Sequence, residues 1–365
     1  MCGIVGFISD NQNEELIKKL VSDLEHRGPD ESGYEIIKTD NGYLHLGSSR
    51  LSITGLLDGK MPMRDSDKNC LIYNGELYEI DKLKSKFNFS TKTKSDTKVL
   101  FEILKRNDPT AISELNGMFA FSFFNSHKNE LVLGRDKLGI KPIYYSQNKR
   151  FSIIFSSEIK PLISNNLIEK TINSSAIESY ILFSGFNSKE QIINNVHAVE
   201  PGELIIFKDN KIKKTKYFSL KDFQDLDIEN QNNLSTVLRE VVNDQLIAEV
   251  PVNILLSGGI DSSLIASVIN SEETTVNAFN LSYKDQEYDE SSKAKLIASE
   301  LGINLKIFEF DVKKNNEIID EIFEKLPEPI SDPSIVPTYY LSKMVSAHTK
   351  AVLVGDGADE LFSGY

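Results

Sequence analysis

The sequence predicts an α+β domain of stacked antiparallel sheets followed by an α/β domain with a parallel sheet. The first part of the chain, 2–215, contains many short β-type runs interrupted by a few helical patterns. From residue 234 onward, helix-type and strand-type segments alternate, which is the order of a parallel sheet with connecting helices. The length of 365 residues also exceeds the roughly 100 to 200 residues typical of one domain. We therefore expect two domains, 2–215 and 234–365, joined by a linker at 216–233.

Strands dominate the first domain, and helices separate some of them. Apolar residues from Ile17 to Leu24 recur at i, i+3, i+4 and i+7, which predicts an amphipathic helix that ends before His26. A second helix is predicted over 97–105. We expect mostly antiparallel neighbours in stacked sheets, with the helices on the outer faces. The predicted strands are 3–8, 43–51, 70–73, 118–124, 130–135, 143–145, 151–156 and 203–207.

The second domain follows a polar, acidic stretch at 221–233 that is typical of a linker. Its predicted helices and strands alternate along the chain, so a parallel sheet is expected. The helices are expected at 234–249, 262–270, 290–301, 317–325 and 337–348. The strands are expected at 252–256, 275–281, 305–310 and 351–354.

Composition narrows the class of protein. A formal net charge of -13 without runs of Lys or Arg argues against a nucleic-acid-binding or anionic-membrane surface. Two cysteines cannot build a disulfide framework, and the five histidines lack the spacing of zinc ligands. The start has no basic segment with an apolar core, and no stretch reaches the 18 or so apolar residues of a membrane span. We expect a cytoplasmic protein, unprocessed apart from Met1.

Cys2 follows the initiator methionine directly. Aminopeptidases that remove Met1 accept a small second residue, so the mature chain is expected to begin with this cysteine. Its thiol would then lie beside an α-amino group whose usual pKa is about 7.7 to 8.0, and that amine can act as the base for its own side chain. Taken alone, Cys2 also fits a small residue at the start of a buried strand.

The segment Ser257–Ser263, with the sequence Ser-Gly-Gly-Ile-Asp-Ser-Ser, follows an apolar strand and opens a helix. Backbone N–H groups and a helix N-terminus converge at such a turn, where a phosphate is favoured. The segment is neither a Walker A loop nor a dinucleotide fingerprint. Its glycines allow close approach, its serines offer hydroxyls, and Asp261 can hold Mg²⁺. The alternative is an ordinary strand-to-helix turn with a serine N-cap.

This segment resembles the loop of the ATP pyrophosphatases, and the opening Met1–Ile4 is characteristic of the glutamine-hydrolysing asparagine synthetases and their relatives. The resemblance continues in order over nearly the whole chain. It implies a class II glutaminase domain of the N-terminal-nucleophile fold, followed by an ATP-binding synthetase domain. Relatives continue well beyond 362–365, so we expect an incomplete synthetase domain. The matching segments are 26–30, 50–53, 74–76, 95–97, 134–136, 139–142, 157–160, 288–290 and 355–362.

In the glutaminase domain, the resemblance implies that Asn74 and Gly75, at a strand end, supply the oxyanion hole for attack by Cys2. From the sequence alone, the same pair fits a type I′ hairpin turn. Arg50 would bind the α-carboxylate of glutamine and Asp96 its α-ammonium, although each alone fits a surface charge. Cys70 is predicted to lie in the core. The implied glutamine-binding residues are Arg50, Leu51, Ser52, Ile53, Thr54, Asn74, Gly75, Glu76 and Asp96.

In the second domain, ligands are expected beyond the carboxyl ends of the strands. The resemblance places adenine and ribose there and puts Asp359 beside Asp261 on Mg²⁺. Without the resemblance, Asp356, Asp359 and Glu360 fit an acidic first helical turn. The implied ATP-binding residues are Leu255, Ser257, Gly258, Gly259, Asp261, Ser262, Ser263, Leu281, Val354 and Gly355, of which Leu281 is predicted to close its strand.

The resemblance implies a glutamine-dependent asparagine synthetase. Cys2 would hydrolyse glutamine, ATP would activate aspartate as an acyl-adenylate with release of pyrophosphate, and ammonia would convert the adenylate to asparagine. Asp356 stands where the family usually has a catalytic Glu, and this shorter side chain leaves other acceptors open, such as a sugar or cell-wall carboxylate. A glutaminase or ATP-binding fragment without synthetase turnover is a third alternative. The expected partners are small-molecule substrates, with a homodimer by analogy with relatives.

Overall fold

The computed structural model describes residues 1–89, 92–106, 108–186, 191–223, 233–271, 275–283, 289–311, 316–326 and 328–364. The chain divides into two compact units. The N-terminal unit comprises 1–227 with 327–329, and the C-terminal unit comprises 228–326 with 330–365. Half of the predicted linker, namely 224–232, and Tyr288 of the 288–290 motif lie outside the described residues.

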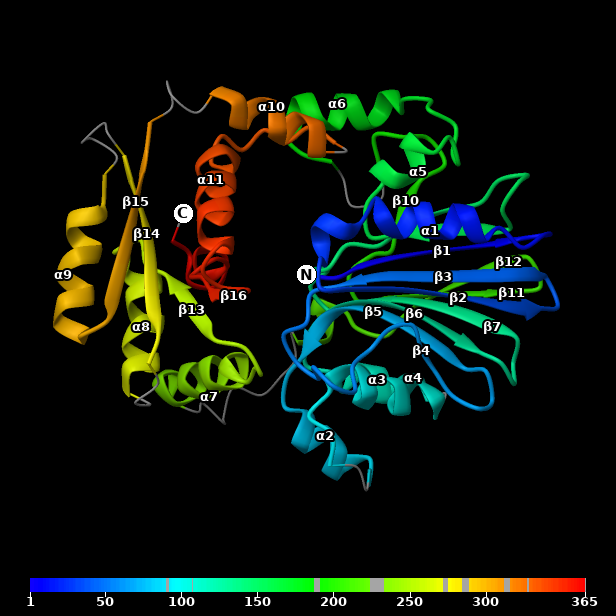
Figure 1. Cartoon of the computed structure of the whole chain (residues 1–365), viewed down its shortest axis with the longest axis horizontal. Coiled ribbons are helices and arrows are strands. Elements are labelled where there is room, and N and C mark those ends of the chain that lie inside the picture. Colours follow the sequence, from blue (N-terminus) through cyan, green and yellow to red (C-terminus); the bar gives the residue numbers. More distant parts are fainter. Residues whose placement is uncertain are drawn as a thin grey trace. The chain divides into compact units, whose positions relative to one another are not determined.

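The N-terminal unit contains two antiparallel six-stranded sheets, which Figure 1 shows stacked. The first has the order β10-β8-β9-β1-β3-β2, and the second has the order β12-β11-β7-β6-β5-β4. The strands of the first sheet are β1 (Gly3–Ser9), β2 (Glu31–Thr39), β3 (Gly42–Arg50), β8 (Tyr144–Ser146), β9 (Ile153–Ser156) and β10 (His197–Ala198). Those of the second are β4 (Met63–Arg64), β5 (Cys70–Leu77), β6 (Gly117–Asn125), β7 (Glu130–Arg135), β11 (Glu203–Lys208) and β12 (Lys211–Lys216).

Helices cover the outer faces of these sheets, as predicted (Figure 1). The alternation of β1 explains the layers, because Ile4 and Ile8 lie in the core between the sheets while Val5 and Phe7 pack beneath α1. The helices of this unit are α1 (Glu14–Ser22), η1 (Glu25–Arg27), α2 (Ile80–Lys86), α3 (Asp96–Lys105), α4 (Pro109–Ser113), α5 (Lys160–Ser164), α6 (Ser174–Phe183) and η2 (Leu220–Phe223). The stacked-sheet prediction is confirmed.

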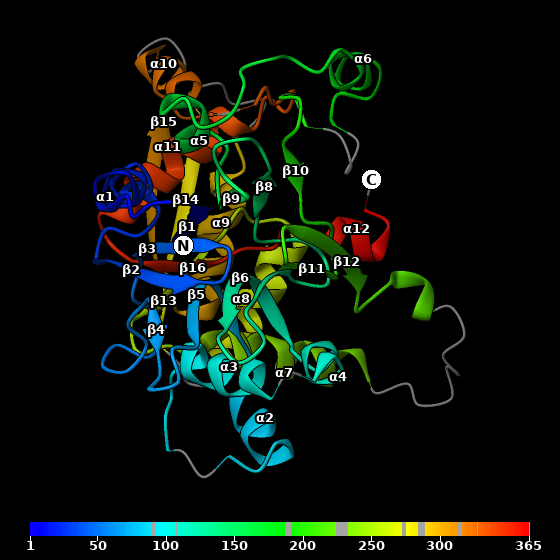
Figure 2. The same cartoon turned by 90° about the vertical axis from the view of Figure 1, so that its right-hand side faces the viewer.

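The C-terminal unit contains a parallel sheet with the order β15-β14-β13-β16, and this prediction is also confirmed. Alternate residues of β13 reach opposite faces, since Ile254 packs with α7, α8 and α9 while Leu255 packs near α11. Figure 2 shows the same strands from the side. The strands are β13 (Val252–Leu255), β14 (Asn277–Tyr283), β15 (Asn304–Phe310) and β16 (Ala351–Leu353). The helices are α7 (Leu234–Leu246), α8 (Ile260–Ser271), α9 (Ser291–Leu301), α10 (Asn316–Lys325), α11 (Ile335–Ser346) and α12 (Ala358–Phe362).

Several predicted boundaries were wrong. β5 continues to Leu77, so Asn74 and Gly75 lie inside a strand, neither at its end nor in a hairpin turn. Pairing with β6 through Gly117 overrides the local turn preference of Asn-Gly. Leu281 does not close β14, which runs two residues further to Tyr283. Among the described residues, every helix is too short or too polar to cross a lipid bilayer.

His45 gives the N-terminal unit a pH-dependent stability. The ring is fully buried in β3 and stacks on Phe7 with centroids 4.2 Å apart. Its Nε2 accepts the Asn13 N–H at 2.9 Å, so Nδ1 carries the proton and donates to the Tyr43 carbonyl at 3.0 Å. Burial lowers the pKa of His45 from its ordinary value, and the hydrogen bonds of the ring with the Phe7 and Tyr43 backbones oppose this effect only in part.

The contribution of His45 to the free energy of unfolding is therefore expected to be fully present above about pH 6.5. It should fall as the pH drops, because the unfolded chain binds a proton that His45 does not bind in the folded state. The slope approaches about 1.4 kcal/mol per pH unit. Urea unfolding followed by circular dichroism at about pH 5 and about pH 7.5 measures it. His45→Phe keeps the stacking ring and should flatten this dependence relative to the unmodified chain. Equal slopes in both proteins would refute the assignment.

Candidate active sites

Cys2 stands immediately before β1, with 8% of its surface exposed. Its backbone N–H donates to Asn74 Oδ1 at 3.0 Å, and its carbonyl accepts the Arg27 Nε–H at 3.0 Å. The Sγ atom lies 3.9 Å from the Leu51 carbonyl oxygen, which is a weak contact. The main chain of Cys2 is thus fixed by two side chains, whereas the thiol remains available for reaction.

The electrostatics at this end of the chain suit proton transfer from a thiol to an amine. Burial raises the pKa of the Cys2 thiol, so the sulfur is neutral at rest. Burial lowers the pKa of the terminal amine, which Met1 carries here, to about 6, although the neighbouring Cys2 opposes this effect. A neutral amine beside a thiol can accept its proton. If Met1 is removed, the amine becomes the Cys2 nitrogen, the atom that faces Asn74 Oδ1.

Asn74 and Gly75 lie on β5 opposite Ala120 and Phe119 of β6. The Asn74 side chain is fully buried, and its Nδ2 meets no hydrogen-bond partner among the described residues. Such a buried donor costs about 1–3 kcal/mol, so it is typical of a site that a ligand completes. A Cβ at Gly75 would lie 2.3 Å from the Met118 carbonyl oxygen, so the backbone leaves room for hydrogen only. The pair matches what an oxyanion hole needs.

Arg27 and Glu158 also support Cys2, although neither residue was predicted to have a role. Arg27 Nη1 donates to Glu158 Oε1 at 2.8 Å while its Nε holds the Cys2 carbonyl. His26 Nε2 lies 3.0 Å from the same carboxylate. Burial raises the pKa of Glu158, but hydrogen bonds from His26 and Arg27 outweigh it, and the net pKa is lowered. The ionised carboxylate orients Arg27. The only sequence signal was membership of the 26–30 and 157–160 motifs.

Arg50 shapes the loop that is predicted to bind glutamine. The side chain is buried, and its Nη2 donates to the carbonyls of Thr54 and Gly55, each at 2.8 Å. Its Nη1 donates to Glu31 at 2.7 Å. Within the described part of the chain, donors therefore remain on Nε and on the second N–H of Nη1. Nearby, the Ser52 N–H donates to Asp30 at 2.8 Å, while Leu51 and Ile53 are half-buried.

A buried carboxylate, Asp96, and a half-buried one, Glu76, form the other end of this loop region. The Thr54 hydroxyl lies 3.0 Å from Glu76 Oε2 and 3.2 Å from Asp96 Oδ1. Burial and then the charge of Asp96 raise the pKa of Glu76. Burial also raises the pKa of Asp96, against the opposing effect of its hydrogen-bond donors. The structure thus brings Thr54, Glu76 and Asp96 together, and their chemistry suits a cationic group.

Lys141 adds a buried positive charge to the region. Its only sequence signal was its place in the matching segment 139–142. The Asp136 carboxylate holds the preceding loop by accepting the N–H groups of Leu138, Ile140 and Lys141 at 2.9–3.1 Å. It also accepts the N–H of Phe119, the β6 partner of Gly75. Burial lowers the pKa of Lys141, and among the opposing charges are those of Glu76 and Cys2.

In the C-terminal unit, Ser257–Ser263 joins β13 to α8 as predicted. Gly258 has φ +91°, and a Cβ there would lie 2.7 Å from the Ala294 nitrogen, so glycine is required. The Ser257 and Ser262 hydroxyls lie 2.9 Å apart, and the Ser263 hydroxyl donates to the Gly259 carbonyl. The first N–H groups of α8 have no partner within the helix, which leaves them for an anion.

The ends of neighbouring strands meet at this loop. A Cβ at Gly355, just after β16, would lie 3.1 Å from both Asp261 Cβ and the Ser262 nitrogen. Val354 and Gly355 therefore adjoin the loop, and Leu255 ends the neighbouring β13. Asp261 and Asp359 are half-buried and Asp356 is exposed. Within the described ranges, no group of three or more His, Cys, Asp or Glu forms a ready-made metal centre.

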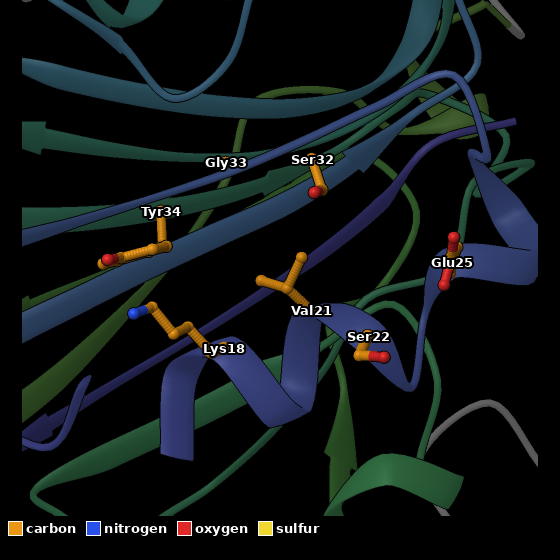
Figure 3. Close-up of a pocket in the computed structure, with 7 residues that line it drawn as sticks. All are labelled: Lys18, Val21, Ser22, Glu25, Ser32, Gly33 and Tyr34. Carbon is orange, nitrogen blue, oxygen red and sulfur yellow. The ribbon is translucent and has the colours of Figure 1, made fainter. Parts of the chain in front are cut away.

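A surface hollow of about 510 Å³ lies elsewhere, between α1 and β2, and Figure 3 shows its lining. Its lysine is already engaged, because Lys18 pairs with Glu14 at 2.6 Å and the Tyr34 hydroxyl donates to the same carboxylate at 2.7 Å. None of the predicted site residues lines this hollow. The lining residues are Lys18, Val21, Ser22, Glu25, Ser32, Gly33 and Tyr34.

Known proteins resemble the chain along its whole length. Residues 1–218 match the glutamine amidotransferase domain family, and residues 233–365 match the asparagine synthase family. The whole chain is 33% identical to putative asparagine synthetase (glutamine-hydrolyzing) 2 of Methanocaldococcus jannaschii, covering 76% of that protein. It is also 33% identical to asparagine synthetase (glutamine-hydrolyzing) 1 of Bacillus subtilis and 30% identical to amidase chyE of Penicillium rubens, covering 59% of each.

These matches confirm the predicted family, whose members are ligases that use ATP and take nitrogen from glutamine. The chain spans between 59% and 76% of the length of the three relatives. The chain belongs to the glutamine-hydrolysing asparagine synthetases, with a glutamine amidotransferase domain followed by an asparagine synthase domain.

Proposed function

We propose that this protein is a glutamine-dependent asparagine synthetase. The observation that carries the proposal is the dual contact of Asn74. Its Oδ1 holds the nitrogen of Cys2, and its Nδ2 is a buried donor without a partner in the described part of the chain. Amide hydrolysis requires a positioned nucleophile and a free donor for the oxyanion. The Asn74 carboxamide serves both needs, because its oxygen holds Cys2 and its nitrogen can donate to the substrate.

In the glutaminase reaction, the α-amine of mature Cys2 accepts the thiol proton as Sγ attacks the side-chain carbonyl carbon of glutamine. The developing oxyanion is stabilised by Asn74 Nδ2 and the Gly75 N–H. The protonated amine then returns its proton to the leaving nitrogen, so that ammonia departs and a thioester remains. Water, deprotonated by the same amine, hydrolyses the thioester to glutamate and restores the thiol. Arg50 is proposed to hold the α-carboxylate, with Glu76 and Asp96 facing the α-ammonium.

In the synthetase reaction, the ATP phosphates are proposed to lie against Ser257–Ser263, with adenine and ribose near Leu255, Leu281, Val354 and Gly355. Asp261 and Asp359 supply carboxylate oxygens, and with phosphate oxygens and water these suit the coordination of Mg²⁺. The ion would neutralise phosphate charge. Aspartate would then attack the α-phosphorus of ATP to form an acyl-adenylate with release of pyrophosphate, and ammonia would displace AMP to give asparagine. Asp356 is proposed to act as the base that keeps the attacking nitrogen unprotonated.

The domain bounds, the partners and the localisation are proposed as follows from the same assignment. The glutaminase domain spans 2–215, the linker 216–233 and the ATP-binding domain 234–365. The partners are small molecules, without nucleic acid, in a cytoplasmic homodimer. The net charge of -13 without basic runs supports the absence of nucleic acid.

A second candidate function is amidation of a different carboxylate. Asp356 favours this second function. Its side chain is one methylene shorter than the family's usual glutamate, which leaves a different volume for the acceptor. The relative from Penicillium rubens, which is named an amidase, shows that similar chains carry other names.

Pyrophosphate release from Mg-ATP and glutamine, with aspartate present or omitted, tests the proposal. We expect aspartate-dependent release that continues in Cys2→Ala when ammonium replaces glutamine, because the two reactions use different residues. Release that ignores aspartate but responds to another carboxylate would favour the second candidate. Glutamate formation without pyrophosphate under any condition would contradict the synthetase assignment.

A further inference from the structure

The contacts of Thr54 favour a single proton in the carboxylate pair. Thr54 Oγ1 lies within hydrogen-bond distance of both Glu76 Oε2 and Asp96 Oδ1, at 3.0 Å and 3.2 Å. A hydroxyl has a single hydrogen, so it donates fully to one carboxylate only. Two ionised carboxylates would leave a lone pair facing an anion at the second contact. A proton on one carboxyl removes that repulsion, because this carboxyl then donates to Oγ1.

The proton belongs on Glu76 because Asp96 is far better supplied with donors. Asp96 accepts from the Tyr73 hydroxyl at 2.9 Å and from the N–H groups of Leu77 and Thr97 at 3.1 Å and 2.6 Å. These donors stabilise a negative charge on Asp96. Among the described residues, Thr54 alone forms a hydrogen bond with Glu76. The ordered chain therefore runs from the Glu76 carboxyl to Thr54 Oγ1, and from the Thr54 hydroxyl to Asp96.

The surrounding charges agree with one proton in this pair. Burial and the charge of Asp96 raise the pKa of Glu76, whereas the charges of Lys141 and the terminal amine oppose them, as would a hydrogen bond donated by Thr54 to an ionised Glu76. The other titratable groups that face Glu76 are the Cys2 thiol and the phenols of Tyr73 and Tyr78, and burial raises the pKa of each. A thiol or a phenol is either neutral or negative, so none of these groups supplies a positive charge that would compensate a second carboxylate.

We propose that Glu76 holds a proton in the free protein and releases it when the α-ammonium of glutamine binds. The inference rests on the proposed function, which places that ammonium beside Glu76 and Asp96. The α-ammonium of glutamine stabilises the ionised form of Glu76. The pocket therefore exchanges a proton for the ammonium group. Glu76 thereby selects ligands that carry an ammonium, because a neutral ligand at this position leaves the proton in place and gains only a hydrogen bond.

Isothermal titration calorimetry of L-glutamine with Cys2→Ala protein tests this exchange, since this protein binds glutamine without hydrolysing it. Titrations at about pH 7 in two buffers of different protonation enthalpy give the number of protons released. We expect close to one proton per glutamine. Glu76→Gln in the same background should bind more weakly and release almost none. Glu35→Gln, which alters a carboxylate that pairs with Arg64 and takes part in none of the proposed glutamine contacts, should release the same proton as the parent.

The pH dependence of binding gives a second measurement that needs no change at Glu76. Because binding releases a proton, the Kd for glutamine in Cys2→Ala protein should rise about tenfold per pH unit as the pH falls below the pKa of Glu76. Binding without proton release, or release that persists in Glu76→Gln, would overturn this inference alone. Absence of any glutamine binding would overturn the proposed function and this inference with it.

Discussion

Cys2→Ala is expected to lower kcat for glutamate formation from glutamine by at least about 10⁴-fold, because it removes the attacking sulfur. Binding should survive, since the contacts of Arg50, Glu76 and Asp96 do not involve the thiol. The measurement is glutamate release from glutamine under saturating conditions.

Cys70→Ala is the matched control, because Cys70 is the second cysteine of the chain. It is fully buried between the two sheets, and burial raises its pKa to about 12, so it offers no thiolate. Its loss should cost some stability and leave kcat within about twofold. Comparable activity in Cys2→Ala and the parent protein would refute the assignment of the nucleophile. Loss of activity in Cys70→Ala, with the fold intact, would also speak against it.

Asn74→Asp is expected to reduce the kcat of the glutaminase reaction by about 10²- to 10³-fold, with a smaller effect on KM. The aspartate keeps an oxygen for the Cys2 N–H, but it replaces the buried Nδ2 donor by a second oxygen that repels the developing oxyanion. Steady-state kinetics of glutamate formation measure both constants.

Asn74→Ala separates the two contacts of the carboxamide. Alanine removes both the donor and the acceptor, so the Cys2 nitrogen also loses its anchor. If the donor dominates, aspartate should be at least as harmful as alanine. Near-normal kcat in Asn74→Asp would show that the side chain only positions Cys2 and that the oxyanion is stabilised elsewhere.

Much of the fold could be predicted because its signals are local. β1 alternates between two buried faces, and Ser257–Ser263 combines an apolar strand, paired glycines and a helix start within one short segment. β2 and β12 were missed, because polar and lysine-rich residues on edge strands hide the usual apolar pattern. β5 was predicted too short, since pairing with β6 decides its end.

The site could be predicted only in part, because several of its contacts join distant segments. Cys2 could be predicted from its position after Met1, and Ser257–Ser263 could be predicted from the spacing of its glycines and serines. The role of Glu158 depends on an ion pair with Arg27 across 131 residues, which no local pattern encodes. Lys141 resembles an ordinary surface lysine in the sequence. Its burial depends on Asp136, whose carboxylate accepts the N–H groups of both Lys141 and Phe119. The proposed proton on Glu76 depends on distances between the side chains of Thr54, Glu76 and Asp96, which come from three separate segments.

The central place of β1 in its sheet bears on the order of events during synthesis. The strand lies between β3 and β9, and the Ile4 N–H donates to Ser157, 153 residues further along the chain. At translation speeds of about 5 to 20 residues per second, the partner segment follows the first residues by about 8 to 30 s. Throughout that interval the nascent N-terminus has no completed sheet to enter. Enzymes that remove Met1 at the ribosome can therefore act before β1 pairs with β9 and Cys2 becomes buried.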